Sequence, residues 1–353
     1  RHVELGFEAD HLLTARVALP ASRYTTPAQV VDFYDHLVSE AGTLPGVTAA
    51  GIVRLLPLAT TIGDWGLDIE GFDEGPNQNA KGDWQVVSPG SFTAMGTRLV
   101  RGRGFTAADR TDSEPVAVVN ETLARTYWRA PGDAVGGRIR LGSNPSRPWV
   151  RVVGVVADER HNSVTGAVKE KFYIPHGQWH IVTGGNLVRD AYVVMRTSGD
   201  PRLLSQPLAQ LVQRLDADLP IATPRPMTDV VAAALATTRL SGFLLVVFAV
   251  AALLLAGVGL YGVLAYVVLQ RTREIGIRMA LGSAPGAILG LVLRQGLGLA
   301  AAGVVTGTIA MLAVSRVLRG MLYQVTPTDP LNLAVMAGLL MLVALAACTI
   351  PGI

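Results

Sequence analysis

Two histidines, His176 and His180, have the spacing in this sequence that comes nearest to a metal site. On a helix, residues four apart lie on one face, and their imidazoles could share a metal ion. Pro175 and Gly177 favour a loop instead, and no third ligand is evident nearby. We therefore predict that this segment is a loop and that it binds no metal.

The sequence motifs of nucleotide-binding and hydrolytic enzymes are missing. A phosphate-binding P-loop places lysine directly after glycine, whereas the chain's only lysines, Lys81, Lys169 and Lys171, follow other residues. No Gly-x-Ser-x-Gly, His-Glu-x-x-His or cysteine pair occurs. We predict no catalytic residue and no bound cofactor, so any ATP that drives the protein would be bound by a partner subunit. Three acidic residues near one another are interpreted as solvated loop charges: Asp109, Asp112 and Glu114.

One segment matches the Gly-x-Gly-x-x-Gly fingerprint of dinucleotide-binding folds, but in the wrong context. The fingerprint needs a strand before it and a turn at its glycines, whereas these glycines lie within the uncharged run from Phe243 to Leu269. Small residues in a membrane helix allow a second helix to approach closely. We predict helix packing for five glycines: Gly257, Gly259, Gly262, Gly303 and Gly307.

The composition indicates that part of the chain lies in a membrane. Of its 353 residues, 50% are hydrophobic and only 16% are charged, below the roughly 25% usual for soluble domains. About 20 apolar residues suffice to cross the hydrocarbon core, and three runs reach or approach that length, at about 241–269, 296–317 and 331–350. The net charge of +3 is too small to indicate nucleic-acid binding.

Arginines in the two short loops between these runs set the expected orientation. Arg and Lys are concentrated in cytoplasmic loops. The first loop carries more arginines than the second, which has Arg316 and Arg319, and it should therefore be cytoplasmic. This topology places residues 1–238 outside the cytoplasm and implies a further membrane helix upstream of Arg1. The arginines of the first loop are Arg271, Arg273, Arg278 and Arg294.

Residues 1–238 are predicted to form an α+β domain with a βαβ-type part. Segments 12–55 and 192–235 both show a strand, a helix and a second extended segment, with helices at Pro27–Ala41 and Pro201–Leu215. Such units predict a sheet with helices on one face. The helix that starts at Thr228 has no proline or glycine before the first apolar run, apart from Gly242 at its edge, and would pass motion from this domain to the membrane.

Between these two segments, at about residues 84–180, we predict a β-rich insert. The remainder of the chain, residues 239–353, is predicted to be an all-α transmembrane domain of three helices. The expected strands of the insert are Trp84–Val87, Pro115–Val119, Arg138–Leu141, Val150–Val156 and Phe172–Ile174, and its helices are Ser91–Met95 and Glu121–Tyr127.

The first predicted cytoplasmic loop, residues 270–285, is amphipathic. Charged residues such as Arg271 and Glu274 fall mostly on one face of a helix, while residues such as Ile275 and Ile277 supply apolar surface. A helix held at the membrane surface by its arginines explains this pattern. Composition alone favours this reading slightly over a docking helix for a cytoplasmic partner, and both stay open.

At this loop the sequence resembles permeases of the FtsX and MacB type, whose cytoplasmic stretch reads R-T-R-E-I-G-I-R-M-A-L-G-A. Arg271–Gly282 reproduces that stretch, and Ser283 replaces the usual alanine. The chain is most similar to the large duplicated permeases named from acidobacteria, of which it would be the second half. Further motifs resemble MacB-like periplasmic core and FtsX-like domains: Val87–Phe92, Leu99–Phe105, Val118–Glu121, Gly154–Val156 and Thr326–Pro330.

The resemblance implies a non-catalytic permease subunit of an ABC transporter in the bacterial cytoplasmic (inner) membrane, with residues 1–238 periplasmic. In such mechanotransmission devices, a cytoplasmic ABC ATPase dimer moves periplasmic domains instead of opening a channel. The resemblance also implies efflux or extraction of a hydrophobic or amphipathic substrate. The implied partners in the membrane are lipid and a second permease half or protomer. The implied ATPase-coupling residues are Arg273, Glu274, Ile275, Gly276, Met279, Ala280, Leu281 and Gly282.

Two other classes of function stay open. A regulatory transmembrane transmitter that activates an envelope (cell-wall) hydrolase would share the same helices and loop. A membrane-anchored enzyme would show hydrolase activity in its outer domain. Recovery of a cell-wall hydrolase in a pull-down with residues 1–238 would favour the transmitter.

Overall fold

The structure is a computed structural model in which the chain divides into two compact units, Arg1–Thr238 and Arg239–Ile353. We call the first the N-terminal unit. Residues 4–72, 79–128, 131–142, 144–164 and 166–270 are described, and beyond them only the helical residues 272, 273, 277, 280, 294, 298, 301–303, 305–309 and 338.

The N-terminal unit contains a sheet built from strands that are far apart in the sequence. Its four strands are β1 (Leu12–Ala18), β2 (Val47–Val53), β10 (Asp190–Thr197) and β11 (Arg225–Pro226), and its helices are α1 (Pro27–Thr43) and α5 (Ser205–Leu215). The order is β11-β1-β10-β2, with every neighbouring pair antiparallel. The β1-α1-β2 and β10-α5-β11 segments are therefore two split βαβ units, each with a strand of the other between its own strands. The predicted mixture of helices and strands is confirmed.

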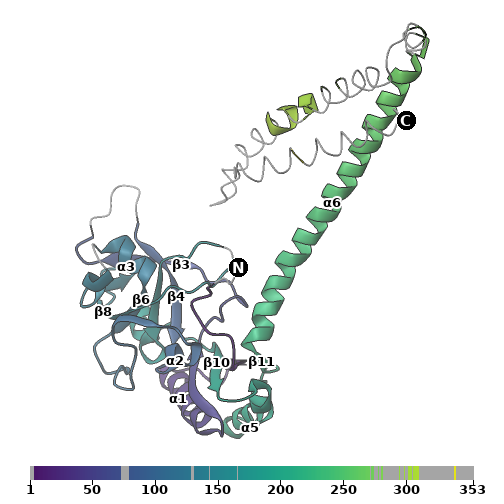
Figure 1. Ribbon diagram of the computed structural model, residues 1–353. Helices are drawn as coiled ribbons and strands as arrows, with labels where there is room; N and C mark the ends of the chain where they lie inside the picture. Colours follow the sequence, from purple (N-terminus) through teal and green to yellow (C-terminus); the bar gives the residue numbers. More distant parts are fainter. Residues whose placement is uncertain are drawn as a thin grey trace. The chain divides into compact units, whose positions relative to one another are not determined.

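Helices α1 and α5 share one core with this sheet (Figure 1). Alternate residues of β1, namely Leu13, Ala15 and Val17, are buried in it, as expected for a strand whose side chains point to opposite faces in turn. Leu37 of α1 and Leu208 of α5 complete the contact and are fully buried. The two helices thus cover one face and leave the other to pack against the rest of the unit.

Both helix starts follow capping signals in the sequence. The Thr26 hydroxyl accepts the Gln29 backbone N–H at 3.4 Å, and the Gln29 side chain accepts the Thr26 N–H at 3.0 Å, which is a capping box. The Asp200 carboxylate accepts the Arg202 N–H at 2.9 Å. It caps a 3-10 turn, η3 (Pro201–Leu204), before α5 begins, so the predicted single helix has two parts.

The connection from β2 to β10 forms a closed ring of six strands. The pairing runs β4-β3-β7-β8-β6-β9 and returns through the parallel pair β9–β4. A small ring of this kind is filled by side chains, here among others Val86, Ile139, Val152 and Phe172, all fully buried. The strands are β3 (Asp64–Ile69), β4 (Lys81–Val87), β6 (Val116–Asn120), β7 (Arg138–Leu141), β8 (Val150–Val156) and β9 (Lys171–Pro175), and β5 (Leu99–Gly102) pairs with β8 beside the ring.

The structure contains most of the strands and helices predicted between residues 84 and 180. Strands β7 and β8, and helices α2 (Ser91–Met95) and α3 (Glu121–Tyr127), have the predicted bounds. Strands β3 and β5 were absent from the prediction. β3 carries apolar residues at alternate positions, Trp65, Leu67 and Ile69, a strand pattern that the prediction missed. β5 is largely exposed and has no such alternation, so its pairing with β8 determines that it is extended.

The segment with the two histidines is helical, and the predicted loop is wrong. Gln178 is fully buried, and its side chain accepts the Val116 N–H at 2.9 Å and donates to the Glu114 carbonyl at 3.0 Å. This contact across the ring fixes the turn and outweighs the local proline and glycine. The elements are the 3-10 turn η2 (His176–Gln178) and helix α4 (Trp179–Thr183).

One ion pair is buried in the N-terminal unit. The Lys171 ammonium donates to the Glu159 carboxylate at 2.8 Å, and the two side chains are only 2% and 6% exposed. The Tyr173 hydroxyl donates to the same carboxylate oxygen at 2.8 Å, and burial raises the pKa of Tyr173 so that it keeps its proton. Burial and the charge of Lys171 lower the pKa of His161 to about 2. His161 is therefore neutral, and its Nδ1 lies 3.4 Å from the ammonium as an acceptor.

Helix α6 (Met227–Gln270) is continuous over 44 residues, as predicted from the lack of a break after Thr228 (Figure 1). Within it, Phe243–Val263 is long and apolar enough to cross a membrane. In the predicted second span, residues 298, 301–303 and 305–309 are helical. The remainder of that span and the third span lie outside the described residues, Gly338 excepted.

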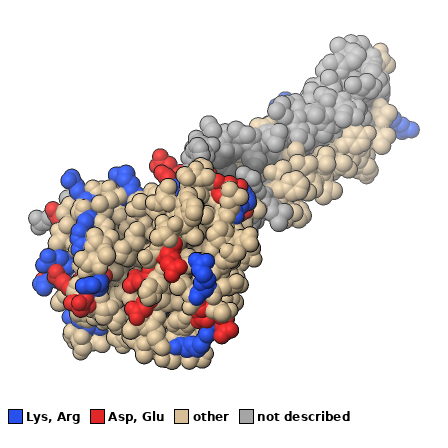
Figure 2. All heavy atoms as spheres, turned by 90° about the horizontal axis from the view of Figure 1, so that it is seen from below, with Lys and Arg blue, Asp and Glu red and all other residues tan. Residues whose placement is uncertain are grey.

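The two units differ in surface character. Lys, Arg, Asp and Glu are spread over the face of the N-terminal unit in Figure 2, whereas the described surface of the second unit is largely uncharged. Large apolar side chains of α6 are exposed, for example Phe243 at 64%, Leu245 at 70% and Leu255 at 74%. Exposed apolar surface of this extent is typical of a segment that lies in lipid.

Candidate functional site at the base of helix α6

Helix α6 begins inside the hydrophobic core of the N-terminal unit. Its first residue, Met227, is fully buried. It belongs to a cluster that includes Leu12 and Val194 from the back of the four-stranded sheet and Val118 from the six-stranded ring. Val230, one turn further along α6, packs against the same cluster. The start of the helix is therefore held where the sheet and the ring meet.

The residues before Met227 are joined to the central strand β1. Leu13 pairs with Pro226 and Thr14 with Arg225, and the buried Thr14 hydroxyl donates to the Arg225 carbonyl at 3.0 Å. We predicted an extended segment from Ile221 to Met227, but only two of its residues form a strand. Pro224 precedes this strand and Pro226 is its second residue, and neither has the N–H that a longer ladder would need.

An ion pair fixes the first turn of α6 from the other side. The Arg202 guanidinium donates to both carboxylate oxygens of Asp229 at 2.9 Å. The two side chains are 60% and 46% exposed, so the pair contributes at most about 1 kcal/mol. Asp229 also lies at the helix N-terminus, where a negative charge is favourable. The sequence signalled this start through Thr228 and Asp229 but not the burial of Met227.

Replacing Met227 with alanine should reduce the free energy of unfolding of the N-terminal unit by about 2–5 kcal/mol, because it empties part of the shared core. Replacing Arg202 with alanine should cost less than about 1 kcal/mol. Denaturant unfolding of the full chain followed by tryptophan fluorescence measures both, since all tryptophans lie in the N-terminal unit. If both variants lost the same free energy of unfolding, the buried contact of Met227 would not be what holds the start of α6.

Beyond its base, α6 has no proline among its 44 residues. At 1.5 Å per residue it is about 66 Å long, and an unbroken helix transmits displacement along its axis without a hinge. A buried start, a β ladder and an ion pair hold one end of this helix in the N-terminal unit. We call residues 225–231 and Arg202 the base of α6.

Most of the predicted coupling residues lie outside the described residues. Arg273 and Ala280 are described, and both are helical. The structure does not describe Glu274, Ile275, Gly276, Met279, Leu281 or Gly282, and their coupling role stays a prediction.

The glycines predicted to pack against another helix have open space around them. A Cβ built at Gly259, Gly262, Gly303 or Gly307 meets no described atom within 4 Å. Gly257 lies on the same helix, α6. No described helix covers these positions, and contact with a partner helix stays a prediction.

The remaining candidate groups belong to local structure in the N-terminal unit. Asp109 is buried, and Arg103 donates to its two carboxylate oxygens at 2.7 and 2.8 Å. It is therefore no solvated loop charge, whereas Asp112 is exposed as predicted. His176 Nε2 lies 2.8 Å from Asp35 Oδ1, and no cluster of three metal-ligating side chains occurs among the described residues.

The geometry defines a class of protein, an α/β domain whose core holds the first residue of a helix able to span a membrane. Two family models match the chain, the MacB-like periplasmic core domain over residues 11–212 and the FtsX-like permease C-terminal domain over residues 246–353. The chain belongs to the family of FtsX-like permeases with a MacB-like periplasmic core domain. The resemblance inferred from Arg271–Gly282 is confirmed at this level.

The chain is similar to export proteins of several bacteria. It is 27% identical to the macrolide export ATP-binding/permease protein MacB of Chromobacterium violaceum over 205 residues, which cover 58% of this chain and 31% of that protein. MacB of Mannheimia succiniciproducens is 25% identical over 267 residues, which cover 75% of this chain and 39% of that protein. The chain thus spans about a third of the length of these relatives. The crystal structure of the periplasmic region of MacB from Actinobacillus actinomycetemcomitans matches with a TM-score of 0.40 and 17% identity over 62% of this chain and 90% of that one.

Proposed function

We propose that the chain is the non-catalytic permease subunit of an ABC-type transporter that works by mechanotransmission. A separate cytoplasmic ATPase dimer would dock on residues 270–285 of the first loop. Its ATP-driven movement would pass along α6 to a periplasmic N-terminal unit and so drive export or extraction of a hydrophobic or amphipathic cargo. The membrane would be the bacterial inner membrane, with three spans in this chain and a second permease half or protomer beside it.

The base of α6 is the observation that carries this proposal. Met227 lies in the core shared by the sheet and the ring. A displacement of the helix would therefore move residues that contact both the sheet and the ring. A flexible linker would be expected if the unit were only tethered to the membrane. Membership of the permease family and the export function in the names of relatives such as MacB support the same conclusion.

The double variant Glu274→Ala with Met279→Ala tests the docking surface. Truncating two contact residues should lower ATPase stimulation by about tenfold or more, because residues central to an interface contribute about 1–2 kcal/mol or more each. The measurement is ATP turnover by the cognate ATPase with and without the purified full-length permease. Ile277→Ala, in the same segment but outside the predicted surface, is the matched control.

Stimulation by the double variant at the level of the unchanged protein would contradict the docking surface. Turnover of the ATPase alone provides the baseline, since it contains none of these residues.

A further inference from the structure

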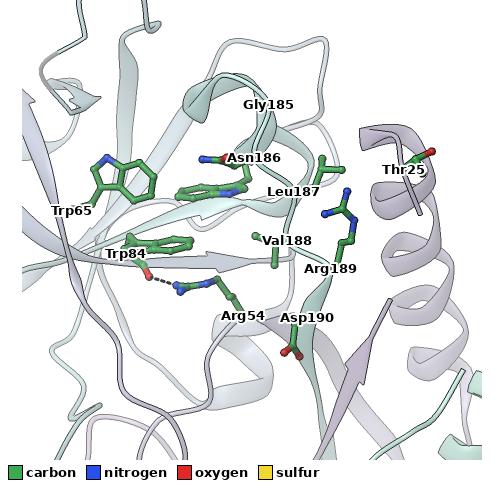
Figure 3. Close-up of a pocket in the computed structure, with 11 residues that line it drawn as sticks. Thr25, Arg54, Trp65, Trp84, Gly185, Asn186, Leu187, Val188, Arg189 and Asp190 are labelled. Carbon is green, nitrogen blue, oxygen red and sulfur yellow. Dashed lines mark hydrogen bonds between the residues drawn. The ribbon is translucent and has the colours of Figure 1, made fainter. Parts of the chain in front are cut away.

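A pocket of the N-terminal unit lies where the four-stranded sheet meets the six-stranded ring. Its volume is about 610 Å³, which is within the range of small-molecule sites. Arg54 follows β2, Trp65 and Trp84 belong to β3 and β4, and residues 185–190 close the opposite side (Figure 3). The pocket is therefore lined by elements from both parts of the unit.

Three aromatic rings and a guanidinium form one wall of this pocket. The Trp84 and Trp179 rings are stacked, with centroids 4.4 Å apart and planes at 2°. Trp65 meets both edge-on at 5.4 and 5.7 Å. The Arg54 guanidinium lies over the Trp84 ring, 3.1 Å from its centroid. Such stacks are rigid, so the wall offers a preformed apolar edge.

The pocket lining carries two arginines, Arg54 and Arg189, and one acidic residue, Asp190. The guanidinium of Arg54 donates to the Trp84 carbonyl at 3.1 Å, and that of Arg189 to the Tyr24 carbonyl at 2.7 Å. Neither has a carboxylate within 4 Å among the described residues. Asp190, the acidic residue of the lining, is bound in a bidentate pair by Arg16, outside the pocket. Burial lowers the pKa of Arg54 to about 10, and the charge of Asp190 opposes this shift.

The wall opposite the tryptophans joins the two cores. Leu187 packs against the core of the four-stranded sheet and Val188 against the core of the ring. The loop begins at two glycines with positive φ, Gly184 at 74° and Gly185 at 113°, a conformation that other residues adopt rarely. A molecule in the pocket would contact both parts of the unit through this loop.

We propose that this pocket binds a small amphipathic anion, with a planar aromatic body against the tryptophan edges and Val188 and a carboxylate between Arg54 and Arg189. The aromatic wall selects a flat apolar body, and the two guanidinium groups select one negative charge. This site is independent of the coupling proposed for α6, because it needs neither an ATPase nor a membrane movement.

Isothermal titration of the full chain in an uncharged detergent tests the proposal with three probes of nearly equal shape. The anion 1-naphthoate should bind saturably, whereas neutral 1-naphthalenemethanol and the cation 1-naphthylmethylammonium should bind at least about tenfold more weakly. Acetate and decanoate complete the series, and both should bind more weakly than 1-naphthoate. Acetate lacks the apolar body, and decanoate has an apolar body that is not planar. Equal affinity of the anionic and cationic naphthyl probes would overturn the proposal.

The variant Arg54→Gln should weaken 1-naphthoate binding by about tenfold or more, the effect of losing one charge-assisted contact. Arg147→Gln is the matched control, because Arg147 lies over the Trp65 ring at 5.7 Å but does not line the pocket. Thermal unfolding of both variants establishes that they are folded, and Arg189→Gln provides a second test if Arg54→Gln is not. Equal weakening by Arg54→Gln and Arg147→Gln would assign binding to general charge and contradict the site.

Discussion

Replacing Ala236 with proline should uncouple the N-terminal unit from the ATPase while leaving both able to fold. Ala236 is an exposed residue of α6, beyond the buried turn at Met227. Proline removes one helical hydrogen bond and clashes with the preceding turn at a cost of about 3 kcal/mol, and it kinks the helix. A kinked α6 bends where an intact helix would carry displacement to its base.

Hydrogen exchange measures this uncoupling. In the full-length permease with its ATPase, ATP should change amide exchange in residues 11–212, and the proline variant should lose that change. Ala236→Gly is the control, since glycine costs only about 1 kcal/mol in a helix and leaves its hydrogen bonds intact. Retention of the ATPase in a pull-down shows that docking survives. An ATP-dependent change that persists in the proline variant would contradict transmission through α6.

Replacing Lys171 with methionine should destabilise the N-terminal unit by about 3–5 kcal/mol. The loss of one member of a buried ion pair leaves the other without a counter-charge in a medium of low dielectric constant. Glu159 would keep only the Tyr173 hydroxyl as its donor. The double variant Lys171→Met with Glu159→Gln removes both charges and should recover a large part of this loss.

Unfolding in urea, followed by tryptophan fluorescence, gives the three free energies needed. A double variant that is as unstable as Lys171→Met alone would show that packing, rather than the ion pair, determines the effect. The exposed pair Arg16 with Asp190 is a suitable control, because its side chains are 53% and 47% exposed and its loss should cost less than about 1 kcal/mol.

The sequence predicted those parts of the fold that depend on local patterns. Helix α1 was predicted because its apolar residues recur with helical spacing after Thr25 and Thr26. Strand β8 was predicted because five of the seven residues of Val150–Val156 are valine. Strand β3 was missed although Trp65, Leu67 and Ile69 alternate with other residues. Helix α4 was missed because the side chain of Gln178 determines its conformation from a distance. Closure of the ring by β9 and β4 depends on residues about 90 positions apart, which no local pattern encodes.

The candidate site was predictable in the same limited sense. Thr228 and Asp229 predicted the start of α6, and the absence of proline predicted that the helix is long. The burial of Met227 was not, because it requires the sheet, the ring and the helix to meet. The pocket was invisible as well, since Arg54, Trp84 and Trp179 are brought together only when the ring closes.

The closed ring and the two-residue β11 leave the N-terminal unit almost without free strand edges. Every ring strand has neighbours on both sides, and β11 offers only Arg225 and Pro226, of which proline has no N–H to donate. Backbone pairing with another polypeptide is thereby limited to short edges such as β5, which pairs with β8 on one side and is largely exposed. Partners of this unit would therefore recognise it mainly through side chains and loops.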